Sequence, residues 1–248
     1  MSVFRFKRFE VVNERSAMKV NTDGVLLGAA MTIRSSDRNL LDVGTGTGTI
    51  ALMAAQRLTD MLAGIEDIPL KIRAIDMDEA SAAEADMNFR NSPWAGILEA
   101  CNTSFEAYAS GLVSDEKFDQ IFSNPPYFDE STEAPERRRN NARHTSTGLS
   151  YRELIDFAAE RLSPEGRLSM VLPSDVENDM TRHARMTGLY LFRIVRIRTV
   201  ERKSPMRIIA EFSRQRCLHP EDRVLTIHDE GKYSEEYLSL THDFYLFA

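Results

Sequence analysis

Apolar and polar positions along the chain follow two spacings in alternation. Short apolar runs, typical of buried strands, are separated by longer segments in which apolar residues recur every three or four positions, as on one face of a helix. Strands are predicted over residues 39–43, 71–76, 97–101, 118–123, 167–172, 190–200 and 207–212. Helices are predicted over 49–62, 79–91, 151–162 and 175–188, and segments 224–229 and 237–246 finish the chain.

This alternation predicts the α/β class. Strands separated by helices of ten or more residues indicate β–α–β units and a parallel sheet. The last two predicted strands are joined by a short connection, which favours an antiparallel hairpin. We therefore expect a mostly parallel seven-stranded sheet with a late antiparallel hairpin and helices on both faces. In such sheets ligands bind beyond the carboxyl ends of the strands, so those ends hold the candidate functional residues.

Composition narrows the class of protein. The 248 residues are 42% hydrophobic and 28% charged, as in an ordinary globular protein, and we expect a single domain. No run approaches the ~20 apolar residues of a membrane helix, and the charged N-terminus is not followed by the apolar segment of a secretory signal. Two distant cysteines without a CxxC pattern argue against a zinc ribbon and a disulfide framework. We expect a cytoplasmic protein with no metal site.

The charge is unevenly distributed. The net charge of −7 gives no overall attraction to nucleic acid, yet residues 192–216 hold eight Lys and Arg against two Glu. A global sum can hide a basic face, although a charge run is more often only a solvated surface.

The first strand end carries a glycine loop, residues 44–48. Gly44, Gly46 and Gly48 alternate with threonines, and Asp42 stands just before them. Glycine lets the backbone approach a ligand closely, although a tight turn alone could also require it. The pattern is neither GxGxxG nor a P-loop. Because a carboxylate repels pyrophosphate, Asp42 favours a ligand that carries an ammonium or sulfonium cation.

The next two strand ends add weaker signals. Asp76 follows the second strand and could accept both hydroxyls of a ribose, or be a plain surface carboxylate. Asp78 could instead cap the following helix. Ser104 belongs to a group of small polar residues after the third strand that could meet an adenine edge.

The fourth strand end is the most informative. It reads Ser123-Asn124-Pro125-Pro126-Tyr127. The two prolines fix the backbone and remove two N–H donors, which leaves carbonyl acceptors beside the side-chain oxygen of Asn124. A planar amino group with two N–H donors matches these acceptors, and Tyr127 offers a flat face on which a ring can stack. A simple Pro-Pro turn is the alternative for the tetrapeptide alone.

Together these motifs resemble the class I S-adenosylmethionine-dependent methyltransferases, and in particular the amino-methylating branch marked by [DN]PP[YF]. Residues 19–28, KVNTDGVLLG, resemble the N-terminal signature of the bacterial tRNA1(Val) adenine-37 N6-methyltransferases. Residues 233–237 and 244–247 resemble that family's C-terminal end. The resemblance covers essentially the whole chain. It implies one Rossmann-like methyltransferase domain over 1–248 with short family-specific extensions at both ends.

The resemblance also implies a cofactor, a substrate and residue roles. S-adenosylmethionine would be held by Asp42, Gly44, Gly46, Gly48 and Asp76, with Thr22, Asp23 and Ser104 assigned to the same site. The family often has Asp where this chain has Ser104. Asn124 and Pro125 would accept the hydrogens of N6 of adenosine 37 in the anticodon loop, and Tyr127 would stack on the base.

The valine tRNA partner would be held by local basic clusters. Two clusters are candidates, one just after the fourth strand and one on the late strands: Arg137, Arg138, Arg139 and Arg143, and Arg196, Arg198 and Lys203. The segment 129–150 is polar and unpatterned, and could become ordered on RNA. The resemblance gives no oligomeric state, and we favour a monomer.

Other readings stay open at this point. A protein glutamine presents a carboxamide that Asn124 would accept equally well, although such methyltransferases usually carry a separate N-terminal helical domain. Another nucleic acid could supply the adenine. A non-catalytic RNA-binding module that kept the fold is also conceivable, although the intact motifs argue against it.

Overall fold

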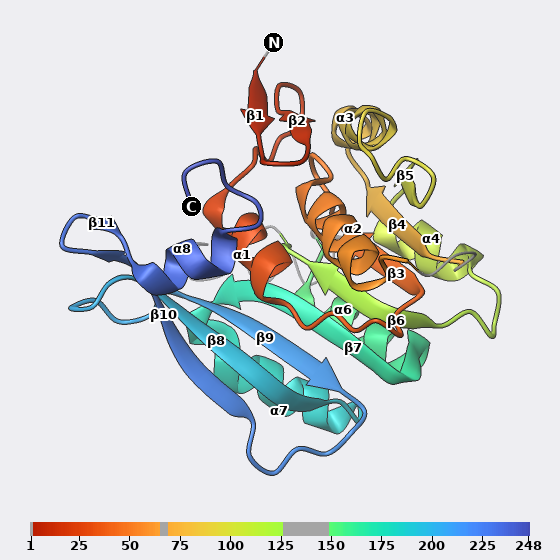
Figure 1. The fold of residues 1–248 in the computed structure, drawn as a ribbon. Coiled ribbons are helices and arrows are strands. Elements are labelled where there is room, and N and C mark those ends of the chain that lie inside the picture. The colour runs from red at the N-terminus through yellow and green to blue at the C-terminus, as the bar shows by residue number, and fades with distance from the viewer. Residues whose placement is uncertain (1, 65–68, 126–148) are drawn as a thin grey trace, which may run out of the picture.

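The computed structural model describes residues 2–64, 69–125 and 149–248, and within these ranges the central sheet has nine strands (Figure 1). From one edge to the other they are β11 (Lys232–Tyr233), β10 (Glu221–Asp229), β8 (Tyr190–Val200), β9 (Arg207–Ser213), β7 (Leu162–Pro173), β6 (Phe118–Ser123), β3 (Asn39–Val43), β4 (Lys71–Asp76) and β5 (Leu98–Asn102). β9 runs antiparallel to β7 and β8, β11 runs antiparallel to β10, and the other pairings are parallel.

The predicted α/β class, the mostly parallel sheet and the late antiparallel hairpin are confirmed. The predicted count of seven strands is wrong, because β10 and β11 extend the sheet beyond β8. In β10 only Leu225 is buried and the other residues are exposed or half-buried, so its sequence lacks the clear alternation of apolar and polar residues that marks a strand. Its pairing with β8 depends on tertiary structure, which local pattern does not report.

Helices cover both faces of the sheet, which gives two hydrophobic clusters (Figure 1). One face carries α1 (Thr22–Ala30), α2 (Thr49–Met61), α3 (Glu79–Arg90) and α8 (Glu235–Thr241). The other carries α4 (Phe105–Gly111), α6 (Tyr151–Arg161) and α7 (Glu177–Met186), which a short 3-10 turn, Ser174–Val176, precedes. Alternate residues of each strand supply the two clusters, as the pleat requires: Leu40 faces one and Leu41 the other.

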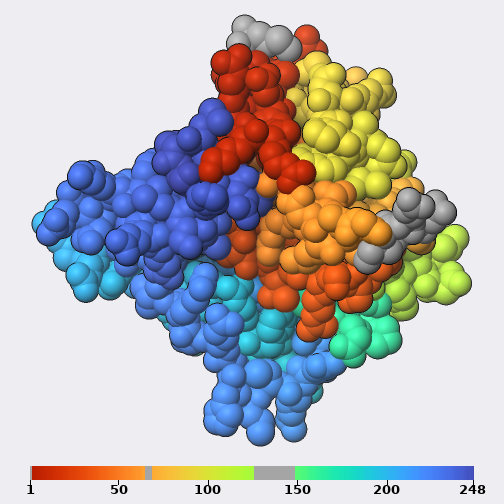
Figure 2. All heavy atoms as spheres, viewed as in Figure 1, coloured from red at the N-terminus to blue at the C-terminus, as the bar shows by residue number. Residues whose placement is uncertain are grey.

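The two ends of the chain lie side by side. A short hairpin is formed by β1 (Val3–Arg5) and β2 (Glu10–Val12), and Phe6, between the two strands, pairs with Tyr245 in an isolated bridge. The rings of Phe6 and Tyr245 stack with their centroids 5.9 Å apart. Figure 2 shows the N-terminal residues, in red, packed against the C-terminal residues, in blue. The N-terminal hairpin and the C-terminal motif at 244–247 therefore share one aromatic cluster, while the N-terminal motif at 19–28 leads into α1.

Candidate active site

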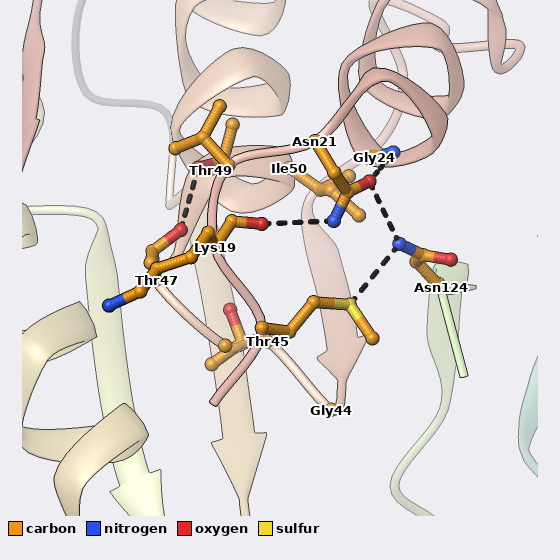
Figure 3. Close-up of a pocket in the computed structure, with 12 residues that line it drawn as sticks. Lys19, Asn21, Gly24, Gly44, Thr45, Thr47, Thr49, Ile50 and Asn124 are labelled. Atoms are coloured by element: carbon orange, nitrogen blue, oxygen red, sulfur yellow. Dashed lines mark hydrogen bonds between the residues drawn. The ribbon is translucent and has the colours of Figure 1, made fainter. Parts of the chain in front are cut away.

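A pocket opens where three segments meet at the carboxyl ends of β3 and β6 (Figure 3). The segment before α1 supplies Met18 to Asn21, and α1 supplies Gly24. The glycine loop and the start of α2 supply the largest share, and the residue after β6 is Asn124. The full lining is Met18, Lys19, Val20, Asn21, Gly24, Gly44, Thr45, Gly46, Thr47, Thr49, Ile50 and Asn124.

Two glycines of the loop serve different purposes. Gly44 has a φ of +72°, and a Cβ added there would meet nothing within 4 Å. Gly48 has a φ of +81°, and a Cβ there would lie 2.5 Å from the ring of Phe89. Gly44 therefore leaves open space beside the pocket, while Gly48 lets α2 begin tightly against α3. Only the first fits the predicted role of giving a ligand close access to backbone.

Asp42 is a buried carboxylate whose two oxygens differ. Its Oδ2 accepts a hydrogen bond from the hydroxyl of Thr45 at 2.7 Å, and its Oδ1 has no hydrogen-bond partner among the described residues. Burial raises the pKa of Asp42 to about 7, opposed by the Thr45 hydroxyl, reinforced by the nearby charge of Asp76, and opposed more weakly by the backbone of Ala51. A buried, incompletely partnered carboxylate of this kind suits a cation.

Asp76 ties the glycine loop to the end of β4. Its carboxylate accepts from the backbone N–H of Gly46 at 2.8 Å and of Asp78 at 2.9 Å. Burial raises the pKa of Asp76, although both hydrogen bonds oppose this. Because a carboxylate has about four acceptor positions, these two bonds leave capacity for hydroxyls of a ligand. Asp78 caps α3 by accepting from the N–H of Ser81 at 2.8 Å.

Three other predicted cofactor residues have structural partners. Ser104 caps α4 by accepting from the N–H of Ala107 at 3.1 Å. Thr22 is the first residue of α1, and Asp23 accepts from Arg207 at 3.1 Å. None of the three belongs to the pocket lining, and neither do Asp42, Asp76 and Gly48. The cofactor contacts of all these residues stay predictions.

Asn124 is held almost fully inside, with 5% of its surface exposed. Its Nδ2 lies 3.4 Å from Oδ1 of Asn21 and 3.5 Å from Sδ of Met18. The preceding Ser123 donates to the carbonyl of Val43 at 2.7 Å and so ties β6 to β3. Pro125 is buried. Pro126 and Tyr127 lie outside the described residues.

Asn21 and Met18 are pocket residues that the sequence analysis missed. An Asn before Thr-Asp-Gly is a typical helix N-cap, and Asn21 does cap α1. That signal locates the start of the helix. It carries no information on a contact with a residue after β6, because the two are 103 positions apart.

Only one of the two predicted RNA-binding clusters lies within the described residues. Arg137, Arg138, Arg139 and Arg143 lie outside the described residues. Arg196 forms ion pairs with Glu177 at 2.6 Å and Asp222 at 2.9 Å, and these partners raise its pKa. Arg198 donates to the Thr226 hydroxyl and to the carbonyl of Glu201, and Lys203 is exposed. A phosphate at Arg196 would have to compete with two carboxylates.

Within the described ranges, no group of three or more His, Cys, Asp or Glu is placed to hold a metal ion. No helix among them is long and apolar enough to cross a membrane.

Comparisons with known proteins agree with this geometry. Residues 15–186 match the model of the methyltransferase small domain. A Bacteroides fragilis tRNA1(Val) (adenine(37)-N6)-methyltransferase is 39% identical over 245 residues, which cover 98% of this chain and 97% of that protein. A Klebsiella pneumoniae protein of the same name is 36% identical over 244 residues, with 98% and 95% covered.

Solved structures show the same fold. A predicted O-methyltransferase from Agrobacterium tumefaciens superposes with a TM-score of 0.59 at 18% identity, over 90% of this chain and 96% of that one. A methyltransferase from Pyrococcus furiosus gives a TM-score of 0.54 at 21% identity, over 82% and 89%. The fold is thus the Rossmann-like fold of the class I methyltransferases. The chain belongs to the methyltransferase small-domain family and, within it, to the tRNA1(Val) (adenine(37)-N6)-methyltransferases.

Proposed function

We propose that this enzyme transfers a methyl group from S-adenosylmethionine to N6 of adenosine 37 in the anticodon loop of tRNA1(Val). The observation that carries the proposal is the position of Asn124, buried beside the glycine loop at the edge of one pocket. A nitrogen-methylating enzyme needs amine acceptors next to its methyl donor. The names of relatives that match nearly the full chain support the RNA substrate.

Residues in and beside the pocket fit the methyl donor. S-adenosylmethionine carries an ammonium and a sulfonium cation, and bound there it would supply an activated methyl group. Asp42 would face the positive end, because its buried Oδ1 has no hydrogen-bond partner within the described ranges. Asp76 would accept the ribose hydroxyls at the end of β4. Gly44 would leave room for the ligand against the backbone.

Asn124 and Pro125 would prepare the target amine. The lone pair of an exocyclic amine conjugates with its ring, so this nitrogen is a poor nucleophile. Two carbonyl acceptors, Oδ1 of Asn124 and the backbone oxygen of Pro125, would hold both N–H groups and keep the nitrogen closer to tetrahedral. The lone pair would then point toward the methyl group. Rate acceleration would come from positioning more than from a tuned base.

The RNA would have to present its base outside the stack. A nucleotide in an anticodon loop is easier to extrude than one in a duplex, because no Watson–Crick pair is broken. From the sequence, Tyr127 would stack on the extruded base. The arginines at 137–139 and 143 would contact the phosphates beside it. We expect a monomeric enzyme that works in the cytoplasm, where its tRNA is found.

Methyl transfer to total tRNA tests this function. The tRNA is taken from a strain that lacks the enzyme, incubated with purified protein and labelled S-adenosylmethionine, and digested to nucleosides. Label in N6-methyladenosine is the expected result. A parallel incubation with cell protein covers the rival substrate, a glutamine side chain. Label in methylglutamine and none in tRNA would overturn the proposal.

A further inference from the structure

We propose that Asn21, the N-cap of α1, is a positioning residue that fixes which end of the Asn124 amide faces the target amine. The inference rests on the proposed function, because it explains how Asn124 presents an acceptor. It concerns two side chains from different segments of the pocket lining, whose polar atoms lie 3.4 Å apart (Figure 3).

The orientation of Asn21 is determined by backbone groups. Its Oδ1 accepts from the N–H of Gly24 at 2.8 Å, and its Nδ2 donates to the carbonyl of Lys19 at 3.0 Å. A backbone N–H can only donate and a backbone carbonyl can only accept. Rotating the Asn21 amide by half a turn would oppose donor to donor and acceptor to acceptor. The oxygen of Asn21 is therefore directed at the pocket side of the helix end.

That oxygen in turn determines the orientation of Asn124. Nδ2 of Asn124 lies 3.4 Å from Oδ1 of Asn21 and 3.5 Å from Sδ of Met18, and both of these atoms are acceptors. The donor group Nδ2 must face them, so Oδ1 points away from Asn21, as Figure 3 shows. Because Asn124 is only 5% exposed, water does little to relieve a wrong orientation.

The consequence concerns the chemical step. With Nδ2 facing α1, Asn124 presents an acceptor to an incoming N–H group. With the amide reversed, it would present two donors and repel the amine. Removing the contact with Asn21 while keeping the helix cap should therefore lower the turnover rate, and it should not weaken binding of the methyl donor.

Three substitutions at this position separate the two roles of Asn21. Asn21→Ser keeps a good N-cap, but its hydroxyl is too short to reach Asn124. Asn21→Ala loses both contacts. Asn21→Asp keeps an oxygen for both Gly24 and Asn124. Cap loss at a second site outside the proposed binding residues, Ser234→Ala on α8, controls for general helix destabilisation.

The readouts are kcat and KM for tRNA methylation, the Kd for S-adenosylmethionine and the unfolding temperature. We expect Asn21→Ser to retain the wild-type unfolding temperature and Kd and to lose about tenfold in kcat, as misplacement of a reacting group does. Asn21→Ala should share that loss and also melt earlier. Asn21→Asp should recover at least about fivefold in kcat over Asn21→Ser.

A wild-type kcat in Asn21→Ser would overturn the inference, as would an Asn21→Asp variant no faster than Asn21→Ser. Asn124→Ala is measured in the same series to separate this failure from failure of the proposed function. If Asn124→Ala is inactive while Asn21→Ser is fully active, only the positioning role is wrong. If Asn124→Ala keeps its rate, or the wild-type protein does not methylate tRNA, the proposed function itself fails.

Discussion

Two fully buried carboxylates, one in the late half of the sheet (β7 to β11) and one in the early half (β3 to β6), differ in how completely they are hydrogen-bonded. In the late half, Glu211 of β9 is fully buried, yet it accepts from Arg193, Ser169 and Thr32. In the early half, Asp42 of β3 is also fully buried, yet its Oδ1 makes no hydrogen bond within the described part of the chain. Satisfied polar groups hold a structure together, whereas an unsatisfied one calls for an explanation.

The difference shows that the number of charged residues in a segment does not by itself indicate a binding surface in this chain. Residues 192–216 are the most basic stretch by local count, but several of their arginines are neutralised by carboxylates from other elements. The glycine loop contacts two carboxylates, Asp42 and Asp76, and the proposed ligand-binding residues lie there. A basic run in the sequence is thus weaker evidence for a binding surface than a single buried carboxylate that lacks a full set of partners.

The largest expected effect is a loss of stability caused by a substitution in the late half of the sheet. Glu211→Ala leaves Arg193, Ser169 and Thr32 without their shared acceptor, and should lower the free energy of unfolding by about 3–5 kcal/mol. Glu221→Ala is the control. It removes the exposed partner of the same arginine and should cost at most about 1 kcal/mol. Urea unfolding measures both, and equal losses would contradict the contrast.

Asn124→Ala, just after β6 in the early half of the sheet, should lower the rate of methyl transfer without unfolding the protein. It removes the acceptor for the target amine, and kcat should fall at least ~100-fold. The free energy of unfolding and the Kd for S-adenosylmethionine should change little. Steady-state kinetics, with circular dichroism as the folding control, decides this. High activity in a well-folded variant would refute the acceptor role.

Asp76→Ala should weaken the binding of S-adenosylmethionine by roughly 1.5–3 kcal/mol, the scale of hydrogen bonds to a charged group. Asp78→Ser is the matched control. It removes a carboxylate two residues away but keeps an N-cap for α3. Calorimetry on the three proteins compares their affinities. Equal affinity in wild type and Asp76→Ala would rule out the ribose assignment.

Asp42 should make stability depend on pH. Its pKa is raised by burial from 3.8 to about 7 in the folded state, so the folded protein holds a proton that the unfolded chain has released. The contribution of Asp42 to stability therefore falls as the pH rises from about 4 to about 7, and is constant above that range. Asp42→Asn should lack this dependence, and should gain stability relative to wild type as the pH rises.

Chemical denaturation at several pH values between 4 and 8 measures the difference between the two proteins. A difference that does not change with pH would show that Asp42 is ionised throughout. Binding of a cationic ligand provides a second test of the protonation of Asp42. Because it favours the ionised carboxylate, binding of S-adenosylmethionine below pH 7 should release protons, and titration in two buffers of different ionisation heat detects them.

The smallest expected effect compares the two basic clusters. Replacing Arg137, Arg138, Arg139 and Arg143 with Ala should flatten the salt dependence of tRNA binding, because each lost phosphate contact lowers the slope by somewhat under one unit. Arg196→Ala should change the slope less, since its guanidinium is paired with Glu177 and Asp222. Parallel lines for the fourfold variant and wild type would reject the first cluster.

The strand ends could be predicted from the sequence because local pattern determines them. Asp42, Asp76 and Asn124 each follow an apolar run, and the β–α–β rule brings such ends to one edge of the sheet. The pairing of β10 with β8 and the ion pairs of Arg196 could not be predicted in this way. Both depend on how distant elements pack, and Glu177 lies on a helix whose placement no local pattern specifies.

The role of Asn21 shows the same limit within the site. In the structure it is a helix N-cap, a role that Asn commonly has, although no helix was predicted there from the sequence. Only the folded chain brings that cap within 3.4 Å of Asn124. The family signature around residues 19–28 therefore includes a contact that its sequence alone does not explain.

Methyl transfer to two versions of one valine tRNA tests the central claim most directly. One transcript carries adenosine at position 37, and the other carries guanosine there, which has no amino group at C6. With labelled S-adenosylmethionine, the account predicts about one methyl group per molecule of the first transcript and none in the second. Equal labelling of the two, or label only in the second, would contradict it.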